Sequence, residues 1–263
     1  MAFPTTIYLS YGQEKVETSE QKQKLGTRAQ TPDGRVFYYA LNSSAAITTA
    51  GFLVDGLVNE ADHDMDKAAT AATAVGSTTV SLEITEASGG SGDLVKNEYA
   101  DGYLIFNDGP GEGEVYRIKS HPAHDASSDA TCVFTLDEPD GIRTALTTSS
   151  IAGLHKNPYN AVALVDGDAG NLNNRTGVLG VTTIPVTASY YFWLQTAGVA
   201  SVSVGAQVAV VGDGLTISQE SGESGQAERA DHSDESDLAT IGVAIGIPSV
   251  SGDKQPCMLH IRH

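Results

Sequence analysis

The fold class is decided by residues 99–139, YADGYLIFNDGPGEGEVYRIKSHPAHDASSDATCVFTLDEP. This stretch holds three short runs of branched and aromatic residues, YLIF, VYRI and CVFTL, each bounded by Gly, Pro, Asn or Asp. Branched and aromatic residues favour strands, whereas the bounding residues favour turns. An alternating run, STTVSLEIT, precedes them at 77–85. Evenly spaced short strands of this kind predict a small barrel or sandwich over residues 75–165.

The same pattern recurs on both sides of this block. Strand-like runs extend from VLGVTTIPV at 178–186 to PCMLHIRH at 256–263. Nearer the N-terminus, Pro32-Asp33-Gly34 predicts a tight turn within a hairpin, because Pro fixes the first central position and Gly accepts positive φ. We therefore expect residues 25–74 and 166–263 to form a main β domain, with 75–165 as a second, barrel-like domain.

Three segments depart from the strand pattern. Residues 1–24 end in a polar run, EKVETSEQKQK, which has little to bury and predicts an extended or mobile N-terminal arm. Acidic residues before the Ala-rich run of 59–75 predict a short helix, because they suit the positive end of the helix dipole. Residues 219–237 are rich in Ser, Gly and carboxylates and predict a surface loop. The expected fold is mainly β: small barrel or sandwich units, a short helix and an extended arm.

Composition limits the partners. The chain has 33 acidic residues against 15 Lys and Arg, a formal net charge of −18, so its field repels phosphate and anionic lipid. We expect neither nucleic acid nor membrane as a partner, and we assign the charge to solubility before cation binding. The start, MAFPTTIYLSYGQEK, lacks a basic region followed by an apolar one, which predicts folding in the cytosol. Cys132 and Cys257 are expected to be buried, reduced thiols.

Motifs for catalysis and metal binding fail one by one. There is no G-x-S-x-G elbow, and no Gly-Lys pair for a phosphate-binding loop. Residues 62–66 begin like a calcium loop, but Lys67 stands where glycine is needed. The HPAH run at 121–124 contains Pro and predicts a solvated loop, and the acidic, Gly-rich run at 107–114 predicts a connection between strands. We expect no enzyme, no metal and no cofactor, although a glycosidase pair of carboxylates leaves no sequence signature.

Four aromatic residues stand in a row at 190–193, YYFW. A strand would place Tyr191 and Trp193 on one face and their neighbours on the other. One face is expected to be core. The other is either core as well or an interface, because large aromatic side chains commonly anchor protein contacts. Tyr191 and Trp193 are therefore the candidate subunit contacts.

Several stretches together resemble a known family. They are KLGTRAQTPDGRVFYYALN (24–42), YADGYLIFNDGPGEGEVYRIKSHPA (99–123), HKNPYNAVAL (155–164), VTTIPVTASYYFWLQTAGVASVSV (181–204) and ATIGVAIGIP (239–248). In residue character and in their order along the chain, they resemble head decoration, or cement, proteins and related virion structural proteins of tailed bacteriophages. The resemblance implies a homotrimer, made in the host bacterial cytoplasm, that binds the major capsid protein on the outer surface of the virion head. It implies no catalysis.

Under this resemblance the N-terminal arm is the candidate for capsid attachment. Its apolar and aromatic side chains are the candidate contacts: Phe3, Ile7, Tyr8, Leu9 and Tyr11. Compact decoration proteins often lack a block like 75–165, which here would be a spike or a trimer contact. Two alternatives remain: a tail or fibre adhesin that binds a host surface glycan, which exposed aromatics in one cleft would favour, and a carbohydrate-active enzyme.

Overall fold

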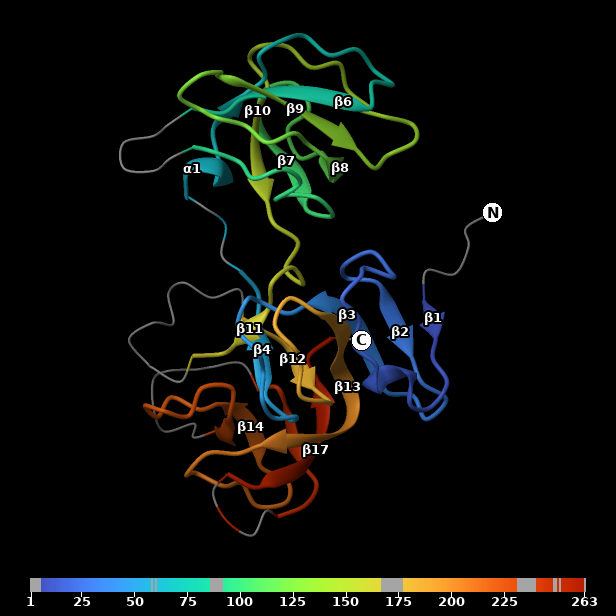
Figure 1. Cartoon of the computed structure of the whole chain (residues 1–263), viewed down its shortest axis with the longest axis vertical. Helices are drawn as coiled ribbons and strands as arrows, with labels where there is room; N and C mark the ends of the chain where they lie inside the picture. Colours follow the sequence, from blue (N-terminus) through green and yellow to red (C-terminus); the bar gives the residue numbers. More distant parts are fainter. Residues whose placement is uncertain are drawn as a thin grey trace. The chain divides into compact units, whose positions relative to one another are not determined.

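The computed structural model describes residues 6–57, 59, 61–85, 92–166, 177–230, 240–247, 250 and 252–262 (Figure 1). The chain divides into two compact units, residues 1–57 with 158–263, and residues 58–157. The protein is nearly all β, as the sequence predicted. In the described part of the chain the only helical segments are α1 (Ala61–Asp64) and a 3-10 turn, η1 (Gln13–Lys15), and no helix there is long and apolar enough to cross a bilayer.

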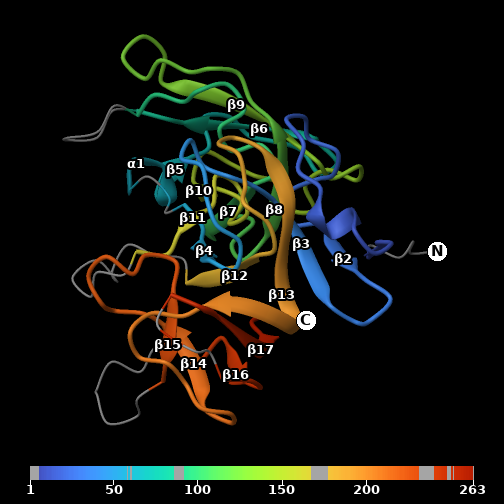
Figure 2. The same ribbon diagram turned by 60° about the horizontal axis from the view of Figure 1, so that its bottom comes forward.

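The described strands of the first unit form one sheet around β13 (Tyr191–Ser203). The others are β1 (Ile7–Tyr8), β2 (Arg28–Gln30), β3 (Val36–Leu41), β4 (Leu53–Asp55), β11 (Ala163–Leu164), β12 (Val178–Thr182), β14 (Gly214–Ile217), β15 (Ala227–Arg229), β16 (Gly242–Ala244) and β17 (Lys254–His260). The first half of β13 pairs with β3 and the second half with β17, so this strand joins two parts of the sheet (Figure 2). The sheet packs against two apolar clusters, one that contains Phe192 and one that contains Val202.

The predicted hairpin of the first unit is present between β2 and β3. The amide of Gly34 donates to the carbonyl of Thr31 over 2.9 Å, and Thr31 N–H donates to the carbonyl of Arg35 over 3.1 Å. Gly34 has φ +85°, a conformation that favours glycine. The Pro-Asp-Gly turn therefore sets the register of these strands.

The N-terminal segment is extended, as expected, but its described part is bonded to the sheet instead of projecting from it. Strand β1 runs parallel to β2, and the amide of Leu9 continues the pairing to Gln30 over 2.9 Å. Further along, Thr18 and Tyr191 exchange hydrogen bonds of 2.9 and 2.8 Å. Because an edge strand such as β2 has unpaired backbone groups, the segment gains hydrogen bonds by lying beside it. Of the two expected states, extended or mobile, residues 6–24 adopt the extended one and are bonded to the sheet.

The second unit is the predicted barrel-like sheet. Its described strands are β5 (Lys67–Ala68), β6 (Thr79–Glu83), β7 (Tyr103–Asp108), β8 (Val115–Ser120), β9 (Thr131–Leu136) and β10 (Ile151–His155), in the order β5-β10-β7-β8-β9-β6. The sheet nearly closes, because Ala69 beyond β5 bridges Leu82 of β6. Leu104, Phe106 and Phe134 fill its core.

The second unit spans residues 58–157, so it begins and ends earlier than the 75–165 that the pattern of strands suggested. Strand β5 pairs with Ile151 and Ala152 of β10, and Thr73 bridges Leu146. The Ala-rich run thus completes the barrel, whereas the short predicted helix is confined to the four residues of α1. Small side chains let this run lie against the barrel edge, and its backbone groups pair there.

Candidate protein-binding surface

An exposed apolar row crosses three adjacent strands of the first unit. Val199 of β13 pairs with Met258 of β17, which in turn pairs with Val243 of β16. Side chains of directly paired residues lie on the same face of a sheet. Their exposed fractions are 51%, 44% and 37%, respectively. The next residues in register, Ala200, Cys257 and Ala244, are all buried, so one face of these strands covers the core and the other presents apolar side chains.

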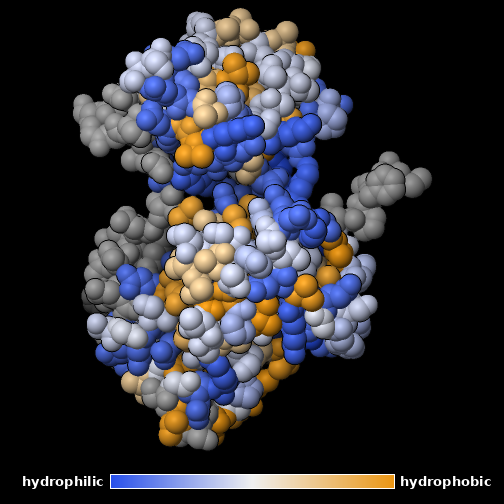
Figure 3. Space-filling view, in the orientation of Figure 1, coloured by the Kyte–Doolittle hydropathy of each residue, from blue (hydrophilic) through white to orange (hydrophobic). Residues whose placement is uncertain are grey.

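The row continues by one further register position. Ser201 pairs with Pro256, and the amide of Ile245 donates to the carbonyl of Pro256 over 3.0 Å. Pro256 and Ile245 are both exposed. We call these five side chains the apolar row: Val199, Val243, Ile245, Pro256 and Met258. Figure 3 shows apolar side chains at the surface of the first unit.

A pocket of about 480 Å³ opens beside the apolar row. Val199 and Pro256 belong to both, and the basic side chains on its wall come from Lys15, Arg35 and Lys254. The rest of the wall is formed by Ala50, Gly51, Val181, Thr182, Thr183, Gln195, Ala200 and Ser201. The pocket is therefore both apolar and cationic.

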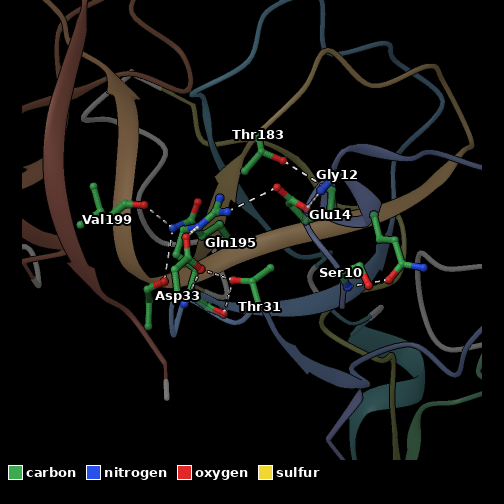
Figure 4. A network of polar contacts seen from close by, with 11 residues as sticks. Ser10, Gly12, Glu14, Thr31, Asp33, Thr183, Gln195 and Val199 are labelled. Carbon is green, nitrogen blue, oxygen red and sulfur yellow. Dashed lines mark hydrogen bonds and ion pairs between the residues drawn. The ribbon is translucent and has the colours of Figure 1, made fainter. Parts of the chain in front are cut away.

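Two carboxylates, those of Glu14 and Asp33, fix Arg35. Figure 4 shows both acidic residues within a network of polar contacts. The Nε of Arg35 lies 2.8 Å from Asp33, and its terminal nitrogen lies 3.4 Å from the buried Glu14. Asp33 also accepts a 2.5 Å hydrogen bond from the hydroxyl of Thr31, and this bond, with the help of Arg35, lowers the pKa of Asp33. Gly12 N–H donates to Glu14 over 2.7 Å. These contacts attach the N-terminal segment to the pocket wall.

The candidate contacts of the N-terminal segment divide into two classes. Leu9 is only 7% exposed and half-buried Ile7 packs against the same core cluster, whereas Tyr8 is 76% exposed and Tyr11 is also exposed. Phe3 lies outside the described residues. Tyr8 and Tyr11 are therefore available to a partner, while Ile7 and Leu9 hold the segment on the sheet.

Tyr191 and Trp193 lie within an aromatic cluster of the first unit. The ring of Tyr39 stacks on Tyr191 at 5.8 Å and meets Trp193 edge-on at 4.9 Å. Trp193 is buried and Tyr191 half-buried, and Phe192 is buried on the opposite face. Both faces of this half of β13 are thus covered within the chain.

Three histidines of the second unit, His63, His121 and His124, are buried, so the expectation of a solvated HPAH loop is wrong for its two imidazoles. His121 is 3% exposed, and its Nε2 accepts a 3.0 Å hydrogen bond from the amide of Tyr99. Nδ1 of His63 lies 2.7 Å from the hydroxyl of Tyr99, and Nε2 of His124 donates to the carbonyl of Ile84 over 2.9 Å. The loop after β8 folds back over the barrel, which removes the imidazoles from water. Among the described residues no three His, Cys, Asp or Glu side chains are grouped to hold a metal ion.

The apolar row was not recognised in the sequence. Its signal is alternation without a polar face: in β16 and β17, Val243 and Met258 alternate with buried Ala244 and Cys257. A strand whose odd and even positions are both apolar has the pattern typical of a strand that is buried on both faces. An exposed apolar face is therefore hidden in such a run.

Comparison with known proteins gives no family for this chain. Neither a family model, nor a curated protein, nor a solved structure matched it. The function is therefore argued from the surface of the first unit.

Proposed function

We propose that this chain is a capsid decoration, or cement, protein, which binds the outer surface of a tailed-phage head and stabilises the lattice of the major capsid protein. The observation that carries a protein-binding function is the apolar row. The resemblance of the sequence to decoration proteins supplies the identity of the partner.

The apolar row has the properties of a protein contact. Contiguous exposed apolar side chains cost free energy in water, and contact with a partner removes that cost. Paired strands hold these side chains in place, so little conformational entropy is lost on binding. Met258, at the centre, has a flexible thioether side chain that adapts to a partner surface.

A decoration protein benefits from several modest contacts on one particle. In a homotrimer, three copies of the row would be linked, so that each contact raises the effective concentration of the others. Tyr8 and Tyr11 offer a second contact on the same unit. Because the described segment that carries them is already bonded to the sheet, binding does not have to order it.

The test is co-sedimentation of the purified protein with undecorated phage heads, together with its mass in solution. We expect saturable binding by a trimer. Met258→Lys should weaken binding at least tenfold, because it places an ammonium in an apolar contact. Val133→Lys is the matched control, because Val133 is an exposed strand residue of the second unit, 43% exposed against 44% for Met258.

Two results would contradict the proposal. One is failure of the wild-type protein to bind heads, and the other is full binding by Met258→Lys. The adhesin alternative would then be tested on a glycan array. In the described residues the exposed aromatic side chains are Tyr8 and Tyr11, which do not form the crowded aromatic cleft that glycan binding favours.

A further inference from the structure

The pocket beside the apolar row gathers cations on an acidic protein. Lys15, Arg35 and Lys254 come from η1, the β2–β3 hairpin and β17, and the described residues that form the wall include no carboxylate side chain. The chain has only 15 Lys and Arg in 263 residues. With three of them on its wall, the pocket has a less negative electrostatic potential than the surface around it.

The three cations are not equivalent. Arg35 is already neutralised by Glu14 and Asp33. Among the described residues, no carboxylate forms an ion pair with either Lys15 or Lys254. Because Glu14 and Asp33 bring two negative charges against the one positive charge of Arg35, the two lysines leave the five groups together with one net positive charge, which is centred on the ammonium groups.

Packing holds the ammonium of Lys254 in place without a counterion. Its Nζ lies 5.0 Å from the centre of the Phe52 ring, a cation–π contact. Gly51 lies against its stem, so closely that a Cβ there would be 3.2 Å from Cδ. Burial lowers the pKa of Lys254, because the charged form loses water. A bound anion would give the ammonium group the counterion that it lacks and would compensate for its lost hydration.

The wall near Lys254 suits a carboxylate on a short apolar stem. The hydroxyl of Ser201 is exposed, and no partner for it exists among the described residues. Val199, Ala200 and Pro256 supply apolar surface. Lys254 and Pro256 are two apart on β17, so both lie on the outer face that carries the apolar row. A ligand in the pocket would thus lie next to a partner on the row.

We propose that this pocket binds the carboxylate of an acidic side chain that a partner protein presents beside the apolar row. The partner's identity rests on the proposed function, whereas binding of the carboxylate is a property of this chain alone. The two ammonium groups and the hydroxyl of Ser201 donate to the carboxylate oxygens, and the apolar wall covers the methylene groups.

The first experiment uses the isolated protein and a minimal probe. N-acetylglutamate amide is titrated while the backbone amide resonances of Gly51 and Ser201 are followed by NMR in every variant, and the Cε and Hε resonances of Lys254 in those that retain it. N-acetylglutamine amide serves as the neutral isostere. We expect saturation at millimolar probe and a rise in the pKa of Lys254. Lys254→Gln should weaken binding at least fivefold. Lys119→Gln, at an exposed strand position of the second unit, should leave it unchanged.

Inorganic phosphate tests a tetrahedral anion against the planar carboxylate. Equal responses to the glutamate and glutamine probes, or undiminished binding by Lys254→Gln, would overturn the inference. Tighter saturation by phosphate than by the glutamate probe would overturn the choice of a carboxylate. Unchanged backbone resonances outside the pocket check that Lys254→Gln is folded.

Phage heads then separate this inference from the proposed function. We expect Lys254→Gln to bind heads at least fivefold more weakly than wild type, and with less dependence on salt. Heads that bind wild type and Lys254→Gln equally would overturn a partner carboxylate in the pocket while the decoration function stands. If wild type takes the probe but not the heads, the carboxylate site stands and the decoration function fails.

Discussion

The amide of Tyr99 donates to Nε2 of His121 over 3.0 Å, and this contact fixes the protonation state of a buried imidazole. A backbone N–H can only donate, so Nε2 must carry no proton, and Nδ1 donates instead to the carbonyl of Pro122 over 2.8 Å. Burial lowers the pKa of His121. Of the titratable groups that face it, Glu98 opposes this shift, while His63 and His124 add to it.

The second unit should therefore lose stability in mild acid. The pKa of His121 is lower in the folded state than the usual value of about 6.5, so the unfolded state binds more protons. The contribution of His121 is fully present above that value and is lost as the pH falls below it, at up to about 1.4 kcal/mol per pH unit for one proton. Urea unfolding between pH 7.5 and 5 measures the slope.

His121→Gln should flatten this dependence by one proton, because the amide oxygen can accept from Tyr99 and does not titrate. His260→Gln, at an exposed position of the first unit, is the control and should keep the wild-type slope. A wild-type slope in His121→Gln would show that the imidazole is not the group that takes up the proton.

Leu9 and Tyr8 distinguish a packed N-terminal segment from a free one. Leu9→Ala should cost about 2–4 kcal/mol of unfolding free energy, because it removes a buried side chain from the core of the first unit. Tyr8→Ala should change it by less than about 0.5 kcal/mol, because that side chain is exposed. Urea denaturation measures both. If Leu9→Ala caused no loss of stability, the N-terminal segment would be mobile, as the polar sequence allowed.

The strands were predictable where local chemistry decides them. The Pro32-Asp33-Gly34 turn and the runs of 99–139 formed as expected, because turn residues and alternation act over a few positions. Glu14 was not predictable in its polar run. It is buried because Arg35, 21 positions away, pairs with its carboxylate, and because Thr183, 169 positions away, donates to its carbonyl.

The candidate site shows the same limit. Tyr8 and Tyr11 could be predicted as partner contacts from their residue types, and both side chains are exposed, as such contacts require. The apolar row and the pocket could not be found in the same way, because Val199 meets Met258 and Val243 only when β13 pairs with β17, and β14, β15 and β16 lie between those two strands in the sequence. Side chains of residues apart in sequence form such a surface, and no local pattern encodes it.

Glu228 is a buried carboxylate whose removal should stabilise the first unit at neutral pH. Burial raises its pKa, against hydrogen bonds from Ser218 and from the backbone of Gln219, and the charges of Glu220 and Glu223 add to the rise. Ser218 has one hydroxyl proton, and its contact with Glu223, at 2.6 Å, is shorter than that with Glu228, at 3.3 Å. A raised carboxyl pKa favours the folded state at low pH, and this contribution is lost as the pH rises through the unfolded and then the folded pKa.

Glu228→Gln should therefore raise the unfolding free energy at pH 7 by about 0.5–1 kcal/mol, and should lose this advantage near pH 4. Glu223→Gln is the matched variant and should be destabilising, because that carboxylate also accepts a 2.8 Å bond from the amide of Ala206. Thermal unfolding at both pH values measures the pair. Destabilisation by Glu228→Gln at pH 7 would mean that its ionised form is well solvated.

The two thiols report on the two units separately. Cys132 lies in β9 of the second unit and Cys257 in β17 of the first, and burial raises the pKa of Cys132 to about 11 and that of Cys257 to about 12. Because the thiolate is the reactive form, both should resist 4,4′-dithiodipyridine in the native protein. In mild urea at pH 5, Cys132 should react before Cys257. Protonation of Nε2 of His121 removes the acceptor for the amide of Tyr99, and this loss weakens the second unit and not the first.

Cys132→Ser and Cys257→Ser assign the two reactions, and adding His121→Gln should slow that of Cys132. Simultaneous labelling would mean that the two units unfold together.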